Sequence, residues 1–122
     1  MWYSIFGMSR SLNKIQLIGN ITRDPELRYT ENGTPLTTFT IATNNSWTTS
    51  QGEKKEETEF IRIVAWQKLA ELCSELLYKG ALVYVSGQLR TRKYDKDGQE
   101  TTVTEVICSD MILLSQPKGG EK

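Results

Sequence analysis

One amphipathic helix with strand-like sequence on both sides constrains the fold of this chain most. Between residues 67 and 78, apolar side chains recur at i, i+3, i+4, i+7 and i+8, which places them in one stripe on a helix. These residues are Leu69, Leu72, Cys73, Leu76 and Leu77. Lys79 and Gly80 follow, as a basic residue and a glycine often do at a helix C-terminus. The sequence therefore predicts one helix, ending near residue 78.

Alternation of apolar and polar residues predicts strands before and after this helix. We expect strands at 15–21, 36–44, 58–66, 81–92 and 100–108, a polar loop at 45–57, and a short edge strand at 111–114. Gly19 marks a bulge or a close approach of two strands. A mainly β chain with one α-helix between strands three and four fits the five-stranded Greek-key barrel of the OB-fold, which binds oligonucleotides or oligosaccharides.

The length of 122 residues suits one such domain. We assign residues 13–114 to the barrel, 1–12 to a loosely ordered N-terminal extension and 115–122 to a short polar tail. The extension contains serine and arginine but no acid, so a cytoplasmic, nucleoid-associated location and an organelle location both stay open. No stretch approaches the roughly 20 apolar residues of a membrane span, so we expect no membrane partner.

Composition excludes several kinds of chemistry. The sequence contains no histidine, which excludes histidine triads and histidine metal sites. Its two cysteines, Cys73 and Cys108, lack CxxC spacing, so we expect no structural zinc. Cys73 lies on the apolar stripe of the helix, where a thiol is normally inert. No Walker loop or other cofactor motif is present, so we expect no catalytic residues, metal or cofactor.

Net charge is zero, with 15 basic and 15 acidic residues, so any polyanion-binding surface requires charges sorted in space. In strand 58–66 we expect Ile61, Ile63 and Ala65 to face the core, because side chains alternate between the faces of a strand. The opposite, outer face of that strand carries Phe60, Arg62, Val64 and Trp66.

The strand at 81–92 repeats this arrangement. We expect its core face to carry Val83, Val85, Gly87 and Leu89. Its outer face carries Tyr84, Arg90, Arg92 and Tyr94, with Lys93 adding charge. We expect the acids to cluster elsewhere, before strand three and on the helix. A solvated barrel exterior explains the arginines, and packing against the helix or a second subunit explains Phe60 and Trp66, so these alternatives stay open.

Aromatic rings interleaved with cations are what single-stranded nucleic acid requires, because bases stack on rings and cations contact phosphates. Trp47 adds a ring in the polar loop at 45–57, where no core is expected to enclose it. The outer face therefore favours binding to single strands with little sequence preference, and Tyr84, which lies on it, is one of the predicted contacts.

Several runs of sequence resemble the bacterial-type single-stranded DNA-binding protein (SSB) family, over residues 13 to about 114. Three of these runs are Asn13-Lys14-Ile15 into Leu17-Ile18-Gly19-Asn20, Asp24-Pro25-Glu26-Leu27-Arg28-Tyr29 and Gly87-Gln88-Leu89-Arg90-Thr91-Arg92-Lys93. The resemblance implies an OB-fold homotetramer that protects single-stranded DNA in replication, recombination and repair. It implies stacking aromatics at Trp47, Phe60, Trp66 and Tyr94, with Phe60 and Tyr94 where relatives often have tryptophan. It implies phosphate contacts from Arg62, Lys68, Lys79, Arg90, Arg92 and Lys93.

Two departures and two alternatives accompany this resemblance. Most bacterial relatives continue into a long tail with an acidic tip that recruits repair enzymes, whereas this sequence ends at Lys122 without one. We therefore expect no capture of replication or repair proteins through such a tail. Residues 1–12 have no counterpart in the family pattern. An accessory primosomal OB protein is expected to lack several of the aromatics, and a carbohydrate-binding OB module has little use for the arginines.

Overall fold

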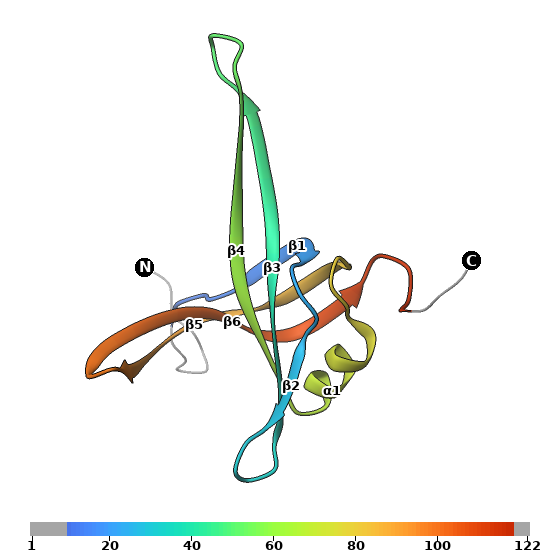
Figure 1. Cartoon of the computed structure of the whole chain (residues 1–122), viewed down its shortest axis with the longest axis vertical. Coiled ribbons are helices and arrows are strands. Elements are labelled where there is room, and N and C mark those ends of the chain that lie inside the picture. Colours follow the sequence, from blue (N-terminus) through green and yellow to red (C-terminus); the bar gives the residue numbers. More distant parts are fainter. Residues whose placement is uncertain (1–9, 119–122) are drawn as a thin grey trace.

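The computed structural model describes residues 10–118, and Figure 1 shows their arrangement. Residues 1–9 of the expected extension and 119–122 of the expected tail lie outside the described residues. The elements in chain order are β1 Ile15–Ile21, β2 Glu26–Tyr29, β3 Pro35–Thr48, β4 Lys54–Trp66, α1 Gln67–Leu76, β5 Leu82–Lys96 and β6 Gln99–Leu113.

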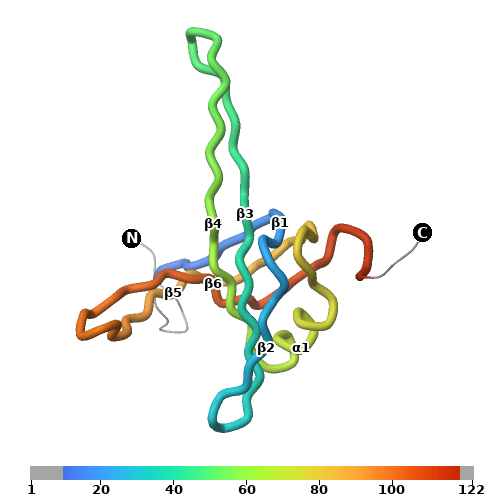
Figure 2. Tube along the Cα trace, viewed as in Figure 1, coloured from blue at the N-terminus to red at the C-terminus, as the bar shows by residue number. Residues whose placement is uncertain are grey.

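The strands form one sheet in the order β1-β5-β6-β4-β3-β2, and an additional β1–β3 pairing closes five of them into a barrel. All of the pairings are antiparallel except that of β4 with β6. Helix α1 connects β4 to β5 and lies against β3 and β4 at one end of the barrel (Figure 2). The predicted OB-fold, mainly β with one helix between its third and fourth barrel strands, is confirmed.

The core fills the barrel and the side of α1 that packs on it. Ile63, Ala65, Val83 and Val85 are fully buried there, as predicted, and Ile61 packs at the margin. At Gly19 two strands approach closely, because a Cβ atom would lie 2.5 Å from the carbonyl oxygen of Ala42. Glycine is thus required where β1 leaves β5 to pair with β3.

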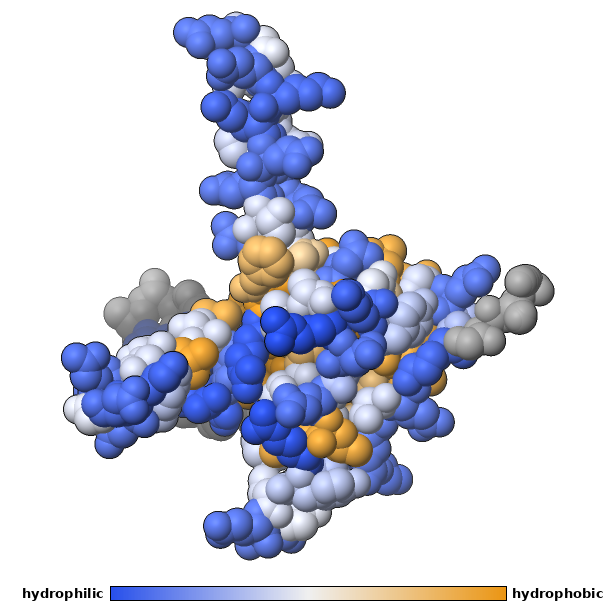
Figure 3. All heavy atoms as spheres, viewed as in Figure 1, coloured by the Kyte–Doolittle hydropathy of each residue, from blue (hydrophilic) through white to orange (hydrophobic). Residues whose placement is uncertain are grey.

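The β3–β4 and β5–β6 hairpins extend beyond the barrel (Figure 1). We call residues 43–59 the β3–β4 arm and residues 90–104 the β5–β6 arm. The polar loop predicted at 45–57 is wrong, because β3 continues to Thr48 and β4 begins at Lys54, with Trp47 paired to Lys55. Only residues 49–53 turn, and Gly52 has a φ of 85°. The β3–β4 arm is hydrophilic along its length in Figure 3.

Other differences from prediction have local causes. Strand β2 was not predicted, and the expected edge strand at 111–114 is the end of β6. Val64 is only 3% exposed although it lies on the outer face, because Thr38 and Ile107 flank it on both sides in the sheet. Leu89 and Leu72, expected to be buried, are each 43% exposed. Leu89 lies where β5 leaves the barrel for the β5–β6 arm.

Helix α1 is shorter than predicted. It ends at Leu76, and the following residue, Leu77, has an extended backbone and a buried side chain. Lys79 therefore lies beyond the last helical turn, which contains no basic residue. The chain leaves the helix early because Leu77 is anchored in the core.

Candidate nucleic-acid interface

Three arginines converge on one glutamate across the middle of the outer sheet face. Glu105 on β6 lies directly opposite Arg90 on β5 and two residues from the partner of Arg92. Strand β4 pairs with the other edge of β6, which brings Arg62 to the same carboxylate. The carboxylate accepts from Arg62 Nε at 3.2 Å, from Arg90 Nη2 at 3.3 Å and from Arg92 Nε at 3.0 Å.

The arginines bury the glutamate while remaining accessible themselves. The Glu105 side chain is 1% exposed, whereas those of Arg62, Arg90 and Arg92 are 41%, 47% and 43% exposed. Burial raises the pKa of Glu105, but the charge and hydrogen bond of Arg92, with hydrogen bonds from Arg90 and Arg62, outweigh it and hold the pKa below its usual range. Three cations against one anion leave this group, which we call the arginine cluster, with net positive charge.

The expectation that acids lie away from the outer face is therefore wrong at Glu105. An acid on this face is tolerated because three guanidinium groups pair with it, and each of them keeps further N–H donors for other partners. The cluster presents those donors to solvent, where a phosphate can accept them.

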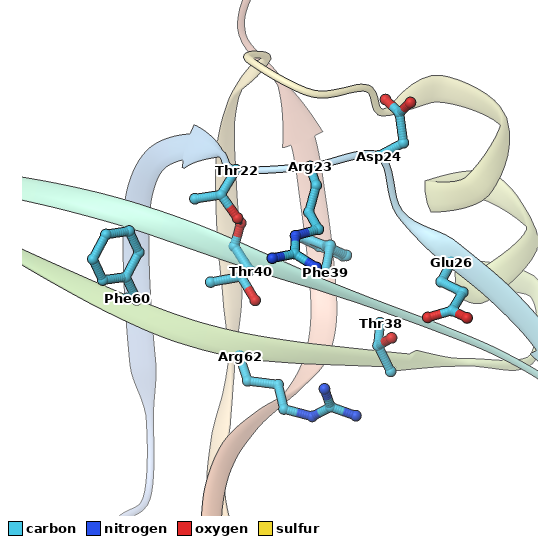
Figure 4. A pocket seen from close by; sticks show the side chains of 9 residues that line it. All are labelled: Thr22, Arg23, Asp24, Glu26, Thr38, Phe39, Thr40, Phe60 and Arg62. Atoms are coloured by element: carbon cyan, nitrogen blue, oxygen red, sulfur yellow. The ribbon is translucent and has the colours of Figure 1, made fainter.

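A hollow of about 550 Å³ adjoins the arginine cluster. The connection between β1 and β2 forms one wall with Thr22, Arg23 and Asp24, and β3 and β4 form the other. In Figure 4 the Arg23 side chain extends from that connection toward β3, between Phe60 on one side and Glu26 on the other. Phe60 is 66% exposed, so its ring is open to a flat ligand.

Trp66, Lys68 and Lys79 lie around the ends of α1. Trp66 is half-buried and precedes the first helical residue, and Lys68 is exposed in the first turn. The backbone N–H of Lys79 donates to Asp24 Oδ1 at 2.8 Å, which holds the segment after the helix against the β1–β2 connection. The structure thus brings Lys79 toward the wall of the hollow that carries Arg23.

The remaining predicted aromatics lie on the arms. Tyr94 is in the β5–β6 arm, 41% exposed, with the Arg92 guanidinium 5.7 Å from its ring centroid. Lys93 lies beside it, 4.0 Å from Glu100. Trp47 is 44% exposed in the β3–β4 arm. Along β3, Trp47 lies five residues beyond Ala42, which pairs with Phe60. Five residues of extended strand span about 16 Å.

Tyr84 is not brought to the other candidate residues. It is six residues from Arg90, about 20 Å along β5. Its strand neighbours are Ile18 on β1 and Ile112 on β6, which are 57% and 50% exposed. Its hydroxyl accepts a hydrogen bond from Gln16 at 3.0 Å. We call Ile18, Tyr84 and Ile112 the apolar row.

Sequence reasoning missed Arg23 and Glu105. Arg23 carried a usable signal, since a cation in the loop joining the first two barrel strands lies where OB-folds bind ligands. Glu105 carried none, because an isolated acid in a strand usually faces solvent. Among residues 10–118 no cluster of histidine, cysteine, aspartate or glutamate is arranged to hold a metal ion. Cys73 is fully buried, and a hydrogen bond with Cys108 together with burial raises its pKa.

No helix within residues 10–118 is long and apolar enough to cross a membrane. The fold and the outer face together define an OB-fold protein with a cationic, aromatic surface of the kind that receives a nucleic acid strand.

Comparison with known proteins names the family. The Single-strand binding protein family matches residues 12–114. The chain is 45% identical over 115 residues to single-stranded DNA-binding protein 1 of Chlorobaculum tepidum, covering 93% of this chain and 71% of that protein. It is 47% identical over 110 residues to the single-stranded DNA-binding protein of Caldanaerobacter subterraneus, covering 89% and 71%.

Solved structures agree with this. The SSB of Plasmodium falciparum, in complex with single-stranded DNA, superposes with a TM-score of 0.81 at 38% identity, over 88% of this chain and 99% of that chain. A deletion mutant of the Thermus aquaticus protein superposes with a TM-score of 0.77 at 31% identity, over 88% and 53%. The chain belongs to the single-strand binding protein family, as the sequence resemblance predicted.

Proposed function

We propose that this protein binds and protects single-stranded DNA, with little sequence preference, during replication, recombination and repair. The observation that carries the proposal is the arginine cluster beside the exposed Phe60 ring and its open hollow. Bases stack on rings and phosphates take the guanidinium N–H groups. The Plasmodium falciparum relative solved with single-stranded DNA supports this assignment.

We assign the contacts by position on the fold. Aromatic rings stack the bases, and cations, to which the structure adds Arg23, contact the phosphates. The proposed stacking residues are Trp47, Phe60, Trp66 and Tyr94. The proposed phosphate contacts are Arg23, Arg62, Lys68, Lys79, Arg90, Arg92 and Lys93. Such a surface requires no metal, cofactor or catalytic group, so we propose that the protein is not an enzyme and works where the DNA is, in the cytoplasm or an organelle.

Titration of oligo(dT) against intrinsic fluorescence at two salt concentrations tests this proposal. We expect quenching on binding, weak binding to duplex of the same length, and affinity that falls with salt by a slope of about 0.7 per phosphate contacted. Equal affinity for duplex and single strand would contradict the proposal. Salt-independent binding to an oligosaccharide, with none to oligo(dT), would instead favour the carbohydrate-binding alternative.

We also propose a homotetramer, built in part on the apolar row. Ile18 and Ile112 flank Tyr84 on the outside of β1, β5 and β6, so three strands present one exposed apolar strip. A second copy of the chain covers such a strip with its own in a self-complementary contact. This position favours self-association for Tyr84 over its predicted DNA contact.

Light scattering on the wild type and on Ile18→Asp tests the assembly. We expect four chains for the wild type at micromolar concentration and fewer for the variant, because a charge in an apolar interface opposes association. Ile18 faces outward, so the variant should keep the melting temperature of the isolated barrel. A monomeric wild type would reject the assembly without affecting the binding proposal.

A further inference from the structure

Glu105 is the one described carboxylate that is fully buried on the outer face, and three cations surround it. These groups come from three different strands, since Arg62 lies on β4, Arg90 and Arg92 on β5, and Glu105 on β6. Because β6 lies between β4 and β5 in the sheet, its side chains alone can reach both neighbours. The glutamate therefore joins two strands that do not pair with each other.

The contacting atoms show how the arginines are held. Arg62 and Arg92 donate to the carboxylate through their Nε–H groups, which lie on the inner edge of each guanidinium group. Their Nη1 and Nη2 atoms are not used in these bonds, and the side chains are 41% and 43% exposed. A guanidinium group fixed by its Nε edge keeps its terminal N–H pair for a second, bidentate acceptor.

We infer that Glu105 is a positioning residue of the DNA-binding surface, which fixes Arg62, Arg90 and Arg92 side by side so that their outer donors meet the phosphates already aligned. This inference rests on the proposed binding of single-stranded DNA. Without the carboxylate, three neighbouring cations repel one another and each must be ordered when the strand binds. Ordering a long side chain at an interface costs affinity, and holding it in place beforehand removes that cost.

This role makes a prediction opposite to that of simple electrostatics. Glu105→Gln removes one negative charge from a surface that binds a polyanion, so charge alone predicts tighter binding. Positioning predicts weaker binding, because the amide has a single oxygen acceptor and no charge to hold three guanidinium groups. Glu100→Gln is the matched control, since Glu100 is on the same strand, 66% exposed, and pairs only weakly with Lys93 at 4.0 Å.

The experiment measures oligo(dT) affinity of wild type, Glu105→Gln and Glu100→Gln at one low salt concentration, with the folded fraction of each checked by thermal melting. We expect Glu105→Gln to bind about tenfold more weakly and Glu100→Gln to bind as tightly as wild type or slightly more tightly. In an Arg92→Ala background the effect of Glu105→Gln should shrink, because part of it acts through Arg92. A purely structural effect would persist at full size there.

Two outcomes would overturn the inference: Glu105→Gln binding as tightly as Glu100→Gln, or an undiminished effect in the Arg92→Ala background. A wild type that does not bind oligo(dT) would instead overturn the proposed function. If Glu105→Gln does not fold, the mobility of the arginine Nε–H groups in the wild type, measured by NMR, tests the inference instead. We expect those of Arg62 and Arg92 to be ordered, and that of Arg28, which pairs with Glu26 through Nη2, to be mobile; equal mobility of all three would overturn the inference.

Discussion

The arginine cluster and the β3–β4 arm belong to one proposed binding surface but are built in opposite ways. In the cluster every charged group is held by another across three strands, above a fully buried core. In the arm, two strands pair only with each other beyond Ala42 and Phe60, and Trp47 is exposed toward its far end. An isolated two-stranded hairpin is marginally stable in water, whereas a closed barrel is cooperative.

This difference separates two requirements of binding a strand of any sequence. Phosphates recur at a regular spacing, so a fixed group of cations suits them. Bases differ in size and orientation, so a ring on an adaptable arm suits them better than one locked in a core. We expect substitutions in the buried interior of the barrel to cost much more stability than substitutions in the arm.

The largest effect is expected from a pair of glycine substitutions that tests this division directly. At Gly87 a Cβ would collide with the backbone carbonyl oxygen of Ile107, so Gly87→Ala should lower the free energy of unfolding by about 3 kcal/mol. At Gly52, in the turn of the arm, the space around a Cβ is open and only the φ of 85° opposes alanine. Gly52→Ala should therefore lower the free energy of unfolding by only about 1 kcal/mol. Urea melts measure both; equal losses would contradict the division.

A smaller effect is expected from removing single rings. Phe60→Ala should weaken oligo(dT) binding by about 1–3 kcal/mol and leave the melting temperature unchanged, because the ring is 66% exposed. Trp47→Ala should weaken binding only to oligonucleotides long enough to reach the arm from the barrel. Affinities measured with oligo(dT) of increasing length distinguish the effect of Phe60→Ala from that of Trp47→Ala. If both variants lose affinity equally for the shortest oligonucleotide, the arm and the barrel act as one site.

The same affinity assay tests Trp66→Ala. The ring of Trp66 is half-buried, between a core side chain and an exposed one. Stacking alone predicts a loss of about 1–3 kcal/mol in affinity with an unchanged salt slope. A ring that mainly packs the start of α1 predicts a loss of stability instead. A variant that melts far earlier, yet binds normally while folded, would remove Trp66 from the proposed contacts.

The smallest effect is expected from pH. The pKa of Glu105 is lowered in the folded state, so its contribution to stability is full above the unfolded pKa of about 4.3 and is lost as pH falls through the lower, folded pKa. The melting temperature of wild type should therefore fall toward that of Glu105→Gln on acidification below about pH 4. Trp47→Ala, in the arm, should follow the wild-type curve. Parallel curves for wild type and Glu105→Gln would show that Glu105 does not titrate in this way.

Period and spacing predicted the parts of the fold that pack against a core. Ile63 and Ala65, or Val83 and Val85, alternate because one face of each strand is buried. The sequence of the β3–β4 arm lacks this signal. A two-stranded ribbon with water on both faces has no buried face, so apolar residues do not recur at every second position. Strand β2 was missed for a related reason, because it has only four residues, none of them buried, and so short a run shows no clear period.

The binding surface was predictable to the extent that its residues lie on one strand at a period of two. Phe60 and Arg62, and likewise Arg90 and Arg92, followed from alternation alone. The burial of Glu105 did not, because the side chains that cover it come from strands 13 to 43 residues away. Arg23 lies in a connection, where no period applies.

The way the guanidinium groups of Arg62 and Arg92 are held has a consequence for sequence variation. In the proposed complex each group serves two acceptors on different edges, the Glu105 carboxylate on the inner edge and a phosphate on the outer edge. Lysine, with a single compact ammonium group, cannot reach both. Replacing Arg92 by lysine, ordinarily a mild substitution, should therefore weaken DNA binding. The same substitution at Arg28, which pairs with Glu26 on the surface, should have no effect on binding.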